Sequence, residues 1–163
     1  MAAETSMRII EGTPPAAGLR VAVVVSKFND FVTGRLQAGA LAALDAAGVA
    51  ETDITVVRVP GAFEIPAAAQ HVAASARFDA VVCLGCLIRG ATPHFEYISS
   101  AVSHGLTAVA AATGVPMAFG VLTTNSVEEA LERAGEGKSN KGWEAATSAV
   151  EMATVIAHLR SLS

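Results

Sequence analysis

Short apolar runs alternate with helical patterns of apolar positions four times along the chain. Each run is rich in apolar residues and ends at a polar or glycine-rich loop, which is typical of buried strands. We expect strands at 20–25, 54–59, 79–85 and 116–122. The stretches between them place apolar residues three and four positions apart, and we expect helices at 32–47, 64–76, 93–113, 126–134 and about 141–159. This alternation predicts one α/β domain over residues 1–163, with a four-stranded parallel sheet between two helical layers.

Several predicted helices carry recognisable end signals. Thr92 offers an N-cap hydroxyl directly before Pro93 at a first helical position. Ser126 and Glu129 have the spacing of a capping box. Gly48 follows the first helix, where a glycine commonly ends one.

The composition indicates that part of the apolar surface meets another subunit. Hydrophobic residues make up 52% of the 163 residues and charged residues only 16%, so a domain of this size has few charges for its outside. The helix at 93–113 carries one charged side chain after Pro93, Glu96. We expect it to meet its copies in a homo-oligomer; a helix buried deep inside the domain is the alternative.

Charge and hydropathy argue against two classes of partner. The net charge of −4 gives no basic field for nucleic acid. No apolar stretch is long enough for a membrane span, and the N-terminus does not read as a signal peptide, so we expect a cytoplasmic protein. Residues 1–18 precede the first strand and are expected to form an N-terminal extension that pairs with a neighbouring subunit.

The cysteine pair Cys83 and Cys86 resembles a redox motif only in its spacing. In one extended strand their Cα atoms are about 10 Å apart, which is too far for a disulfide. We expect both thiols to be buried and structural.

Four loops should form any ligand site, because ligands of parallel sheets bind beyond the carboxyl ends of the strands. They span 26–31, 60–64, 86–94 and 123–125. Gly85, at the end of the preceding strand, and Gly90, in the third loop, have the spacing of the P-loop glycines, but Ala91 stands where the lysine is required. A phosphate monoester bound by backbone N–H groups is favoured over a nucleoside triphosphate, and a glycine turn without a ligand is the alternative.

His94 lies at the start of the helix that follows this loop. The helix dipole there disfavours the imidazolium form, so His94 is a candidate neutral base, although a packing or capping role fits as well. The remaining histidines, His71, His104 and His158, lie within predicted helices and show no metal-ligand spacing.

Three further side chains each allow a structural and a functional interpretation. Glu64 either accepts N–H groups of a heterocycle or caps its own helix. Phe28 either packs sideways or stacks on a planar ring. Arg133 either interacts with the end of its helix or binds a phosphate with two N–H groups, which Lys141 could do only as a point charge.

Several strings together closely resemble the lumazine synthase family. They are IIEG from Ile9, VPGAFEIP from Val59, LGCLIRGATPHFEYI from Leu84, GVLTTN from Gly120 and ERAGEGKSNKGWEAA from Glu132. The likeness covers about residues 8–160, in order and without large gaps, and RGATPHF together with GAFEIP is highly specific.

The resemblance implies a flavodoxin-like α/β sandwich and a condensation reaction. In that family 5-amino-6-(D-ribitylamino)uracil and 3,4-dihydroxy-2-butanone 4-phosphate give 6,7-dimethyl-8-ribityllumazine, with release of phosphate and water and without cofactor or metal. By position, His94 resembles the proton-transfer residue and Arg133 the cationic partner of the phosphate. The remaining substrate-binding positions implied are Phe28, Asn29, Ala62, Phe63, Glu64, Leu87, Ile88, Gly90, Ala91, Thr92, Phe119 and Lys141.

The resemblance also implies an assembly. Phe119 and Lys141 match residues that reach the site from an adjacent subunit or its rim, so the site is expected between subunits. Family members form pentamers, some form shells of twelve pentamers, and riboflavin synthase is a candidate partner. Two positions depart from the family pattern: a lysine common at Gly137 is displaced to Lys138, and Cys86 replaces an apolar residue.

Two other classes of function are compatible with the same sequence. One is a cage or scaffold protein of this fold without activity. The other is a phosphate- or flavin-binding module, for which His94 would have no purpose.

Overall fold

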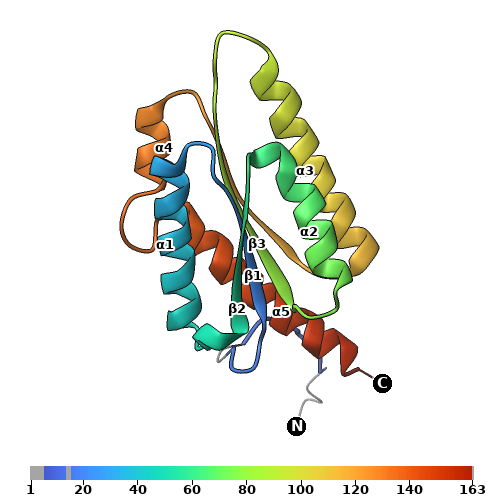
Figure 1. The fold of residues 1–163 in the computed structure, drawn as a ribbon. Helices are drawn as coiled ribbons and strands as arrows, with labels where there is room; N and C mark the ends of the chain where they lie inside the picture. The colour runs from blue at the N-terminus through green and yellow to red at the C-terminus, as the bar shows by residue number, and fades with distance from the viewer. Residues whose placement is uncertain (1–5, 14–15, 163) are drawn as a thin grey trace.

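A parallel sheet in the order β2-β1-β3-β4 forms the centre of the molecule in the computed structural model, which describes residues 6–13 and 16–162 (Figure 1). The strands are β1 (Val21–Ser26), β2 (Ile54–Val59), β3 (Ala80–Ile88) and β4 (Met117–Thr124). The helices are α1 (Asp30–Ala46), α2 (Ile65–Ala74), α3 (His94–Thr113), α4 (Val127–Arg133) and α5 (Lys141–Arg160). Two 3₁₀ turns, η1 (Glu51–Asp53) and η2 (Ala62–Glu64), precede β2 and α2.

The helices form one layer on each face of the sheet, as predicted. Helices α1, α4 and α5 cover one face, and α2 and α3 cover the other (Figure 1). A hydrophobic core lies on each face of the sheet, and successive residues of β1 point to the two cores alternately. Val21, Val23 and Val25 pack toward α1 and α5, and Ala22 and Val24 pack toward α2 and α3. A strand covered on both faces needs apolar residues at every position, which is why the run around β1 is continuous rather than alternating.

The strand order creates a crevice at the carboxyl ends of β1 and β3. These strands are neighbours, but the chain leaves β1 toward α1 on one face and leaves β3 toward α3 on the other. Two loops that diverge in this way leave a space between them, which is where open α/β sheets bind ligands.

β3 ends three residues later than predicted and begins one residue later. It continues to Ile88 because β4 also extends, with Cys86, Leu87 and Ile88 opposite Leu122, Thr123 and Thr124. Three residues assigned to a loop from the sequence therefore lie in the sheet. Gly85 is buried within the strand, so the GxxxxG spacing does not form a P-loop.

The prediction that Thr92 caps α3 is wrong. The helix begins at His94, Pro93 occupies the N-cap position, and no side chain caps it. The carbonyl of Pro93 accepts the first helical bonds, from the N–H groups of Glu96 and Tyr97. His94 is consequently the first helical residue, with its ring at the mouth of the crevice.

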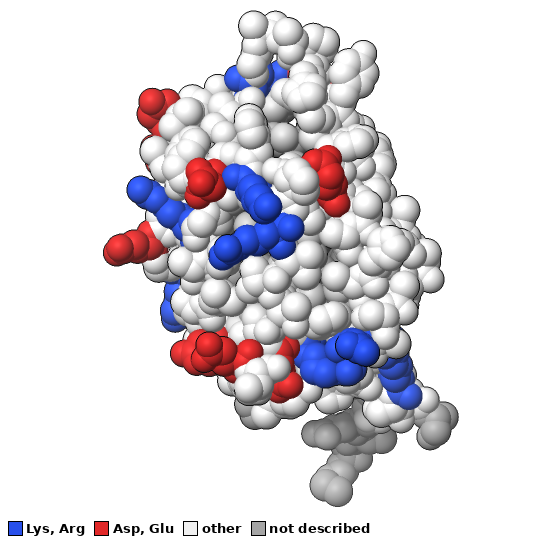
Figure 2. Space-filling view, in the orientation of Figure 1, with Lys and Arg blue, Asp and Glu red and all other residues white. Residues whose placement is uncertain are grey.

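Helix α3 lies on the outside of the molecule, so the alternative of a deeply internal helix is wrong. Only Val102, Leu106 and Val109 of this helix are buried, and Tyr97 is 73% exposed. Much of the molecular face in Figure 2 is likewise uncharged. The single chain therefore leaves large apolar side chains outside, and their burial against another subunit stays a prediction.

The remaining sequence predictions concern the thiols and the N-terminus. Cys83 and Cys86 lie in one strand, buried and unpaired, and burial raises their pKa values to about 12 and about 11. The expectation of two buried thiols without a disulfide between them is confirmed. Of the expected extension, residues 1–5 and 14–15 lie outside the described residues, and residues 6–13 contain no strand. No helix in the described part of the chain is both long and apolar enough to cross a membrane.

Candidate active site

A cavity of about 620 Å³ opens at the carboxyl ends of β1, β2 and β3 and at the start of α3. A volume of this size suits a small organic ligand. We call it the central cavity. It is lined by Phe28, Asn29, Gly61, Ala62, Phe63, Glu64, Cys86, Leu87, Ile88, Gly90, Thr92, His94, Phe95 and Ile98.

The loop after β1 is held in place by backbone and side-chain bonds. Asn29 has a left-handed backbone (φ 63°), and its Nδ2 donates to the carbonyl oxygen of Cys86 over 3.0 Å. The N–H of Phe28 donates to the carbonyl of Pro60 over 3.0 Å. The aromatic ring of Phe28 remains 71% exposed at the cavity. This geometry favours stacking on a planar ligand over sideways packing.

Glu64 is at the N-cap position of α2, but its carboxylate does not cap the helix. Its own N–H donates to the carbonyl of Gly61 over 3.2 Å, which closes the turn η2. The half-buried carboxylate lines the central cavity. Of the two interpretations of Glu64, the structure supports an acceptor available to a ligand.

The segment between β3 and α3 presents unpaired N–H groups beside His94. Within the described residues, the amides of Gly90, Ala91 and Thr92 donate no hydrogen bond to the protein. His94 is exposed, and its side chain lines the cavity rather than packing into the core. Free amides at the start of a helix are suited to an anion such as a phosphate.

Arg133, Phe119 and Lys141 lie elsewhere, around a second cavity of about 330 Å³ beside β4 and α5, which we call the Arg133 cavity. None of its lining residues also lines the central cavity. Nη1 of Arg133 donates to the carbonyl of Glu129 over 3.1 Å, the helix-end role allowed by the sequence. Nζ of Lys141 lies 2.8 Å from Oε2 of Glu144.

The central cavity thus contains most, but not all, of the residues that the sequence singled out. It brings together the candidates of three separate loops and His94, while Ala91 lies beside it in the segment from Gly90 to Thr92. Gly61 and Cys86 lie in two of the expected ligand loops but were not singled out as site residues, and Phe95 and Ile98 were missed. The helical spacing from His94 to Ile98 was a usable signal for the last, because residues four apart share one helix face.

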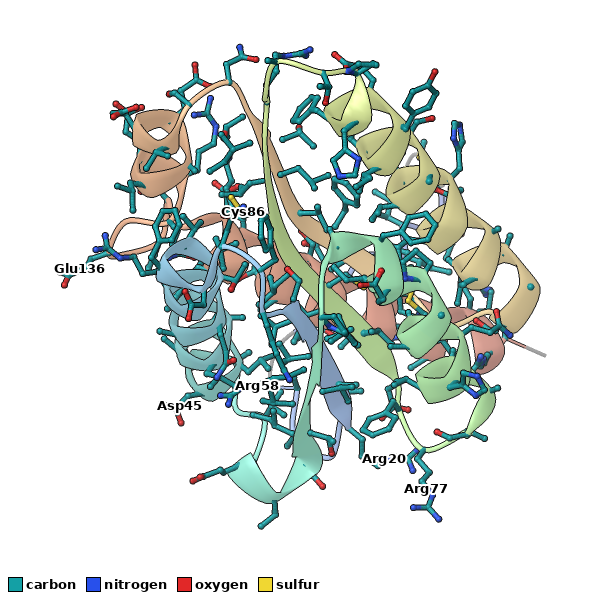
Figure 3. All side chains as sticks on the ribbon, turned by 45° about the horizontal axis from the view of Figure 1, so that its top comes forward. Arg20, Asp45, Arg58, Arg77, Cys86 and Glu136 are labelled. Atoms are coloured by element: carbon teal, nitrogen blue, oxygen red, sulfur yellow. The ribbon has the colours of Figure 1, made fainter. Side chains whose placement is uncertain are left out.

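The side chains around the central cavity can bind a planar ring and a hydrogen-bond donor and can move protons, and the free backbone amides beside His94 can bind an anion. Figure 3 looks toward this end of the sheet and labels Cys86 among the surrounding side chains. Within the described part of the chain, no group of three or more His, Cys, Asp or Glu side chains is placed to hold a metal ion.

Comparison with known proteins identifies the family. Residues 18–157 match the family described as 6,7-dimethyl-8-ribityllumazine synthase. The chain is 53% identical to a protein of Syntrophus aciditrophicus (strain SB) named 6,7-dimethyl-8-ribityllumazine synthase. The identity is measured over 148 residues, which are 91% of this chain and 96% of the relative. With the family's sequence over most of its length and a cavity suited to a ring and a phosphate, this chain belongs to the 6,7-dimethyl-8-ribityllumazine synthase family.

Proposed function

We propose that the central cavity is the place where this chain carries out its family's reaction. The enzyme condenses 5-amino-6-(D-ribitylamino)uracil with 3,4-dihydroxy-2-butanone 4-phosphate to 6,7-dimethyl-8-ribityllumazine in riboflavin biosynthesis. The 5-amino group attacks the ketone to give an imine with loss of water, and phosphate leaves by elimination. After tautomerisation to a carbonyl, the ribitylamino nitrogen attacks that carbonyl and closes the second ring with loss of a second water. The convergence of a stacking ring, a free carboxylate, free amides and a histidine on one cavity carries this proposal.

The uracil is proposed to bind on the side of the cavity formed by the first two loops. The exposed ring of Phe28 would cover the face of the heterocycle. Leu87 and Ile88 would contact its edge, and Asn29, Ala62, Phe63 and Glu64 would surround the ribityl chain, with Glu64 accepting from its hydroxyls.

The butanone phosphate is proposed to bind at the segment from Gly90 to Thr92. Its phosphate would accept hydrogen bonds from the free N–H groups of Gly90, Ala91 and Thr92. These amides would lose no internal hydrogen bond when the phosphate binds. This places the reacting carbon chain toward His94. Holding two reactants in one orientation can account for much of the rate.

His94 is proposed to move the protons that imine formation, elimination and ring closure require. An imidazole can both accept and donate a proton near neutral pH. Its exposed position on the first turn of α3 leaves it reachable from the bound substrates.

Arg133 is proposed to reach the phosphate from a second copy of the chain. In one chain it lines a different cavity from His94. Phe119 and Lys141 line that same Arg133 cavity, so the three would arrive together if it faced the central cavity of a neighbour. Two different surfaces meeting in this way make a heterologous contact, which can close into a ring. We therefore propose a homopentamer, with or without assembly into a shell of twelve.

Three further proposals concern the location of the enzyme, its N-terminal extension and its protein partner. We place the enzyme in the cytoplasm. The N-terminal extension would pair with a neighbouring subunit. Riboflavin synthase would use the product and is the proposed protein partner.

The direct test mixes purified protein with both substrates and follows the lumazine chromophore. We expect His94→Ala and Arg133→Ala each to lower kcat/KM by about 100-fold, as loss of a proton-transfer or phosphate-binding group does. His104→Ala is the matched control, since this exposed histidine lies on the same helix, lines neither cavity and, among the described residues, is hydrogen-bonded only to Ser100. Unchanged rates in both variants would remove the proposed roles. Light scattering tests the assembly, and a monomer would contradict it.

A further inference from the structure

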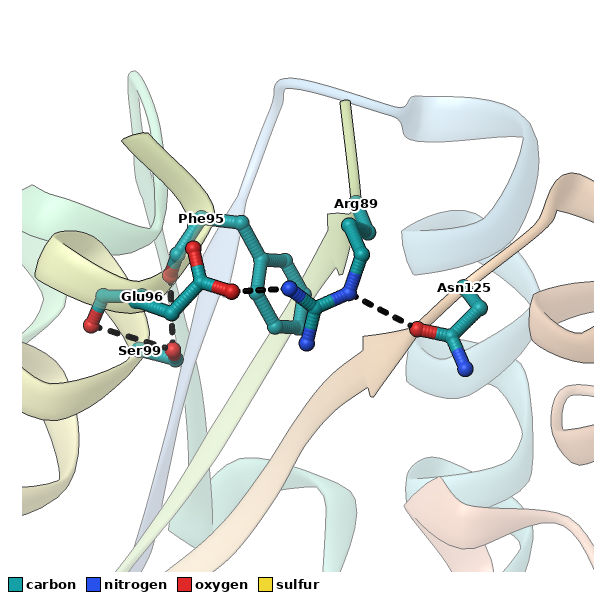
Figure 4. Close-up of polar contacts among 5 residues, drawn as sticks. All are labelled: Arg89, Phe95, Glu96, Ser99 and Asn125. Atoms are coloured by element: carbon teal, nitrogen blue, oxygen red, sulfur yellow. Dashed lines mark hydrogen bonds and ion pairs between the residues drawn. The ribbon is translucent and has the colours of Figure 1, made fainter. Parts of the chain in front are cut away.

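Arg89 connects three parts of the structure around the segment that holds the free amides. It follows β3 directly, and its Nε donates to Oδ1 of Asn125, after β4, over 2.9 Å. Its Nη1 pairs with Oε1 of Glu96 on the first turn of α3. The guanidinium also lies over the ring of Phe95, 4.5 Å from the centroid (Figure 4).

These contacts fasten both ends of the segment from Gly90 to Pro93. The N–H of Arg89 donates to the carbonyl of Thr124 over 2.8 Å, which fixes the end nearest β3. The bond to Glu96 and the contact with Phe95 fix the end nearest α3. Between them, the amides of Gly90, Ala91 and Thr92 donate no hydrogen bond to any described residue, so the middle of the segment is not held by its own N–H groups.

The guanidinium of Arg89 is already paired with other side chains of the protein. The carboxylate of Glu96 neutralises the guanidinium of Arg89. The backbone N–H of Glu96 and the side chain of Arg89 both donate hydrogen bonds to this carboxylate, and these bonds lower its pKa, so the pair stays ionised at neutral pH. A guanidinium that is paired on both sides is a poor direct ligand for a phosphate but can orient the chain that carries it.

We propose that Arg89 is a positioning residue for the reaction, which fixes the segment so that its amides and His94 act on one substrate. This inference rests on the proposed binding of the phosphate at that segment. Removal of Arg89 would let the segment sample other conformations and would raise the cost of ordering it around the phosphate.

The competing interpretation is an ordinary surface ion pair, which usually contributes little. The chain provides a matched control for it. Arg20 pairs with Asp79, and its side chain is 47% exposed, the same fraction as that of Arg89. Figure 3 shows Arg20 at the far end of the sheet from Cys86.

The kinetic experiment compares Arg89→Ala, Arg89→Lys and Arg20→Ala in the full-length enzyme, with each substrate varied in turn. We expect Arg89→Ala to raise KM for the butanone phosphate about tenfold and to change KM for the uracil less than twofold, since only the phosphate segment is loosened. Arg89→Lys should recover part of the loss, because it keeps the charge without the planar fork. Arg20→Ala should match wild type. An unchanged Arg89→Ala enzyme, or equal rises in both KM values, would overturn the proposal.

A second readout does not depend on catalysis. Amide hydrogen exchange at positions 89, 96 and 97, whose N–H groups are bonded to the carbonyls of Thr124 and Pro93 at the two ends of the segment, should become at least about fivefold faster in Arg89→Ala and unchanged in Arg20→Ala. Glu96→Gln keeps Arg89 and should shift both readouts in the same direction by less, which covers the case in which Arg89→Ala does not fold. Unchanged exchange in these variants would overturn the proposed positioning role of Arg89, even if the enzyme were active. If His94→Ala keeps full activity while exchange responds as expected, it is the proposed site that fails.

Discussion

Glu64 and Ser126 occupy equivalent positions on their helices and serve different ends. Ser126 accepts a hydrogen bond from the N–H of Glu129 over 3.1 Å and so caps α4. Glu64 stands at the N-cap position of α2 and makes no such bond. A carboxylate that does not stabilise its own helix, and that lines a cavity, is free for a ligand.

This contrast gives the first prediction. Glu64→Gln should lower kcat/KM by about tenfold to a hundredfold, because a charge-assisted bond to the ribityl hydroxyls is weakened. Its free energy of unfolding should stay within about 0.5 kcal/mol of wild type. Ser126→Ala should do the reverse, with normal activity and a loss of about 1 kcal/mol. Urea unfolding and initial rates measure both; a stability loss in Glu64→Gln equal to that in Ser126→Ala would contradict the assignment.

The two thiols give a prediction about reactivity. The thiolate is the reactive form, and burial raises the pKa of Cys83 to about 12 and of Cys86 to about 11. Because the unfolded thiols ionise near 9.0, their contribution to stability is complete below that pH and is lost as pH rises toward 12.

We therefore expect neither thiol to react with an aromatic disulfide reagent at pH 8 within minutes, and both to react after denaturation. Raising the pH from 8 to 10 should lower the midpoint of urea unfolding, and by less in Cys83→Ala. Rapid stoichiometric labelling of the native protein would show that one thiol is accessible.

At the scale of elements, α1 and α5 approach closely through one glycine. Gly142 is buried at the start of α5, and a Cβ built there would overlap the backbone carbonyl of Leu36 in α1. Gly34, in the first half of α1, has no atom within 4 Å of the same built position. The two residues offer one substitution in two environments.

Gly142→Ala should destabilise the protein by about 1–3 kcal/mol, because the helices must separate. Gly34→Ala should stabilise it by about 0.5–1 kcal/mol, since alanine favours the helix and meets no obstacle. Midpoints of chemical unfolding compare the two. Equal effects in the two variants would show that packing between α1 and α5 does not depend on Gly142.

The sequence was a good guide to the elements and a weaker one to their ends near the site. The bounds of β2 were predicted correctly because its β-branched run is closed by Pro60 and Gly61. The end of β3 was predicted three residues too early, since Gly85 reads as the end of the strand until the pairing of the next three residues with β4 is known. Thr92 reads as a cap, but the helix begins two residues later. The error at the end of β3 comes from pairing between distant segments.

At the scale of the whole molecule, the residues proposed for one reaction line two cavities. The sequence motifs assigned His94 and Arg133 to the same reaction. The periodicity of the sequence could not show that, within one chain, these two residues line different cavities. Nor could it reveal the contacts of Arg89 with Asn125, which follow from the sheet order. Uncharged surface on the single chain is consistent with further burial in an assembly.

The most direct test of the account is complementation between two inactive variants. His94→Ala and Arg133→Ala are unfolded together, refolded as a mixture and assayed for lumazine, beside each variant and wild type treated alike. Random mixing leaves about one quarter of the interfaces with both side chains intact, because each is present in half of the subunits. We predict about a quarter of the refolded wild-type activity. A mixture no more active than its components, while refolded wild type is active, would contradict a site shared between copies.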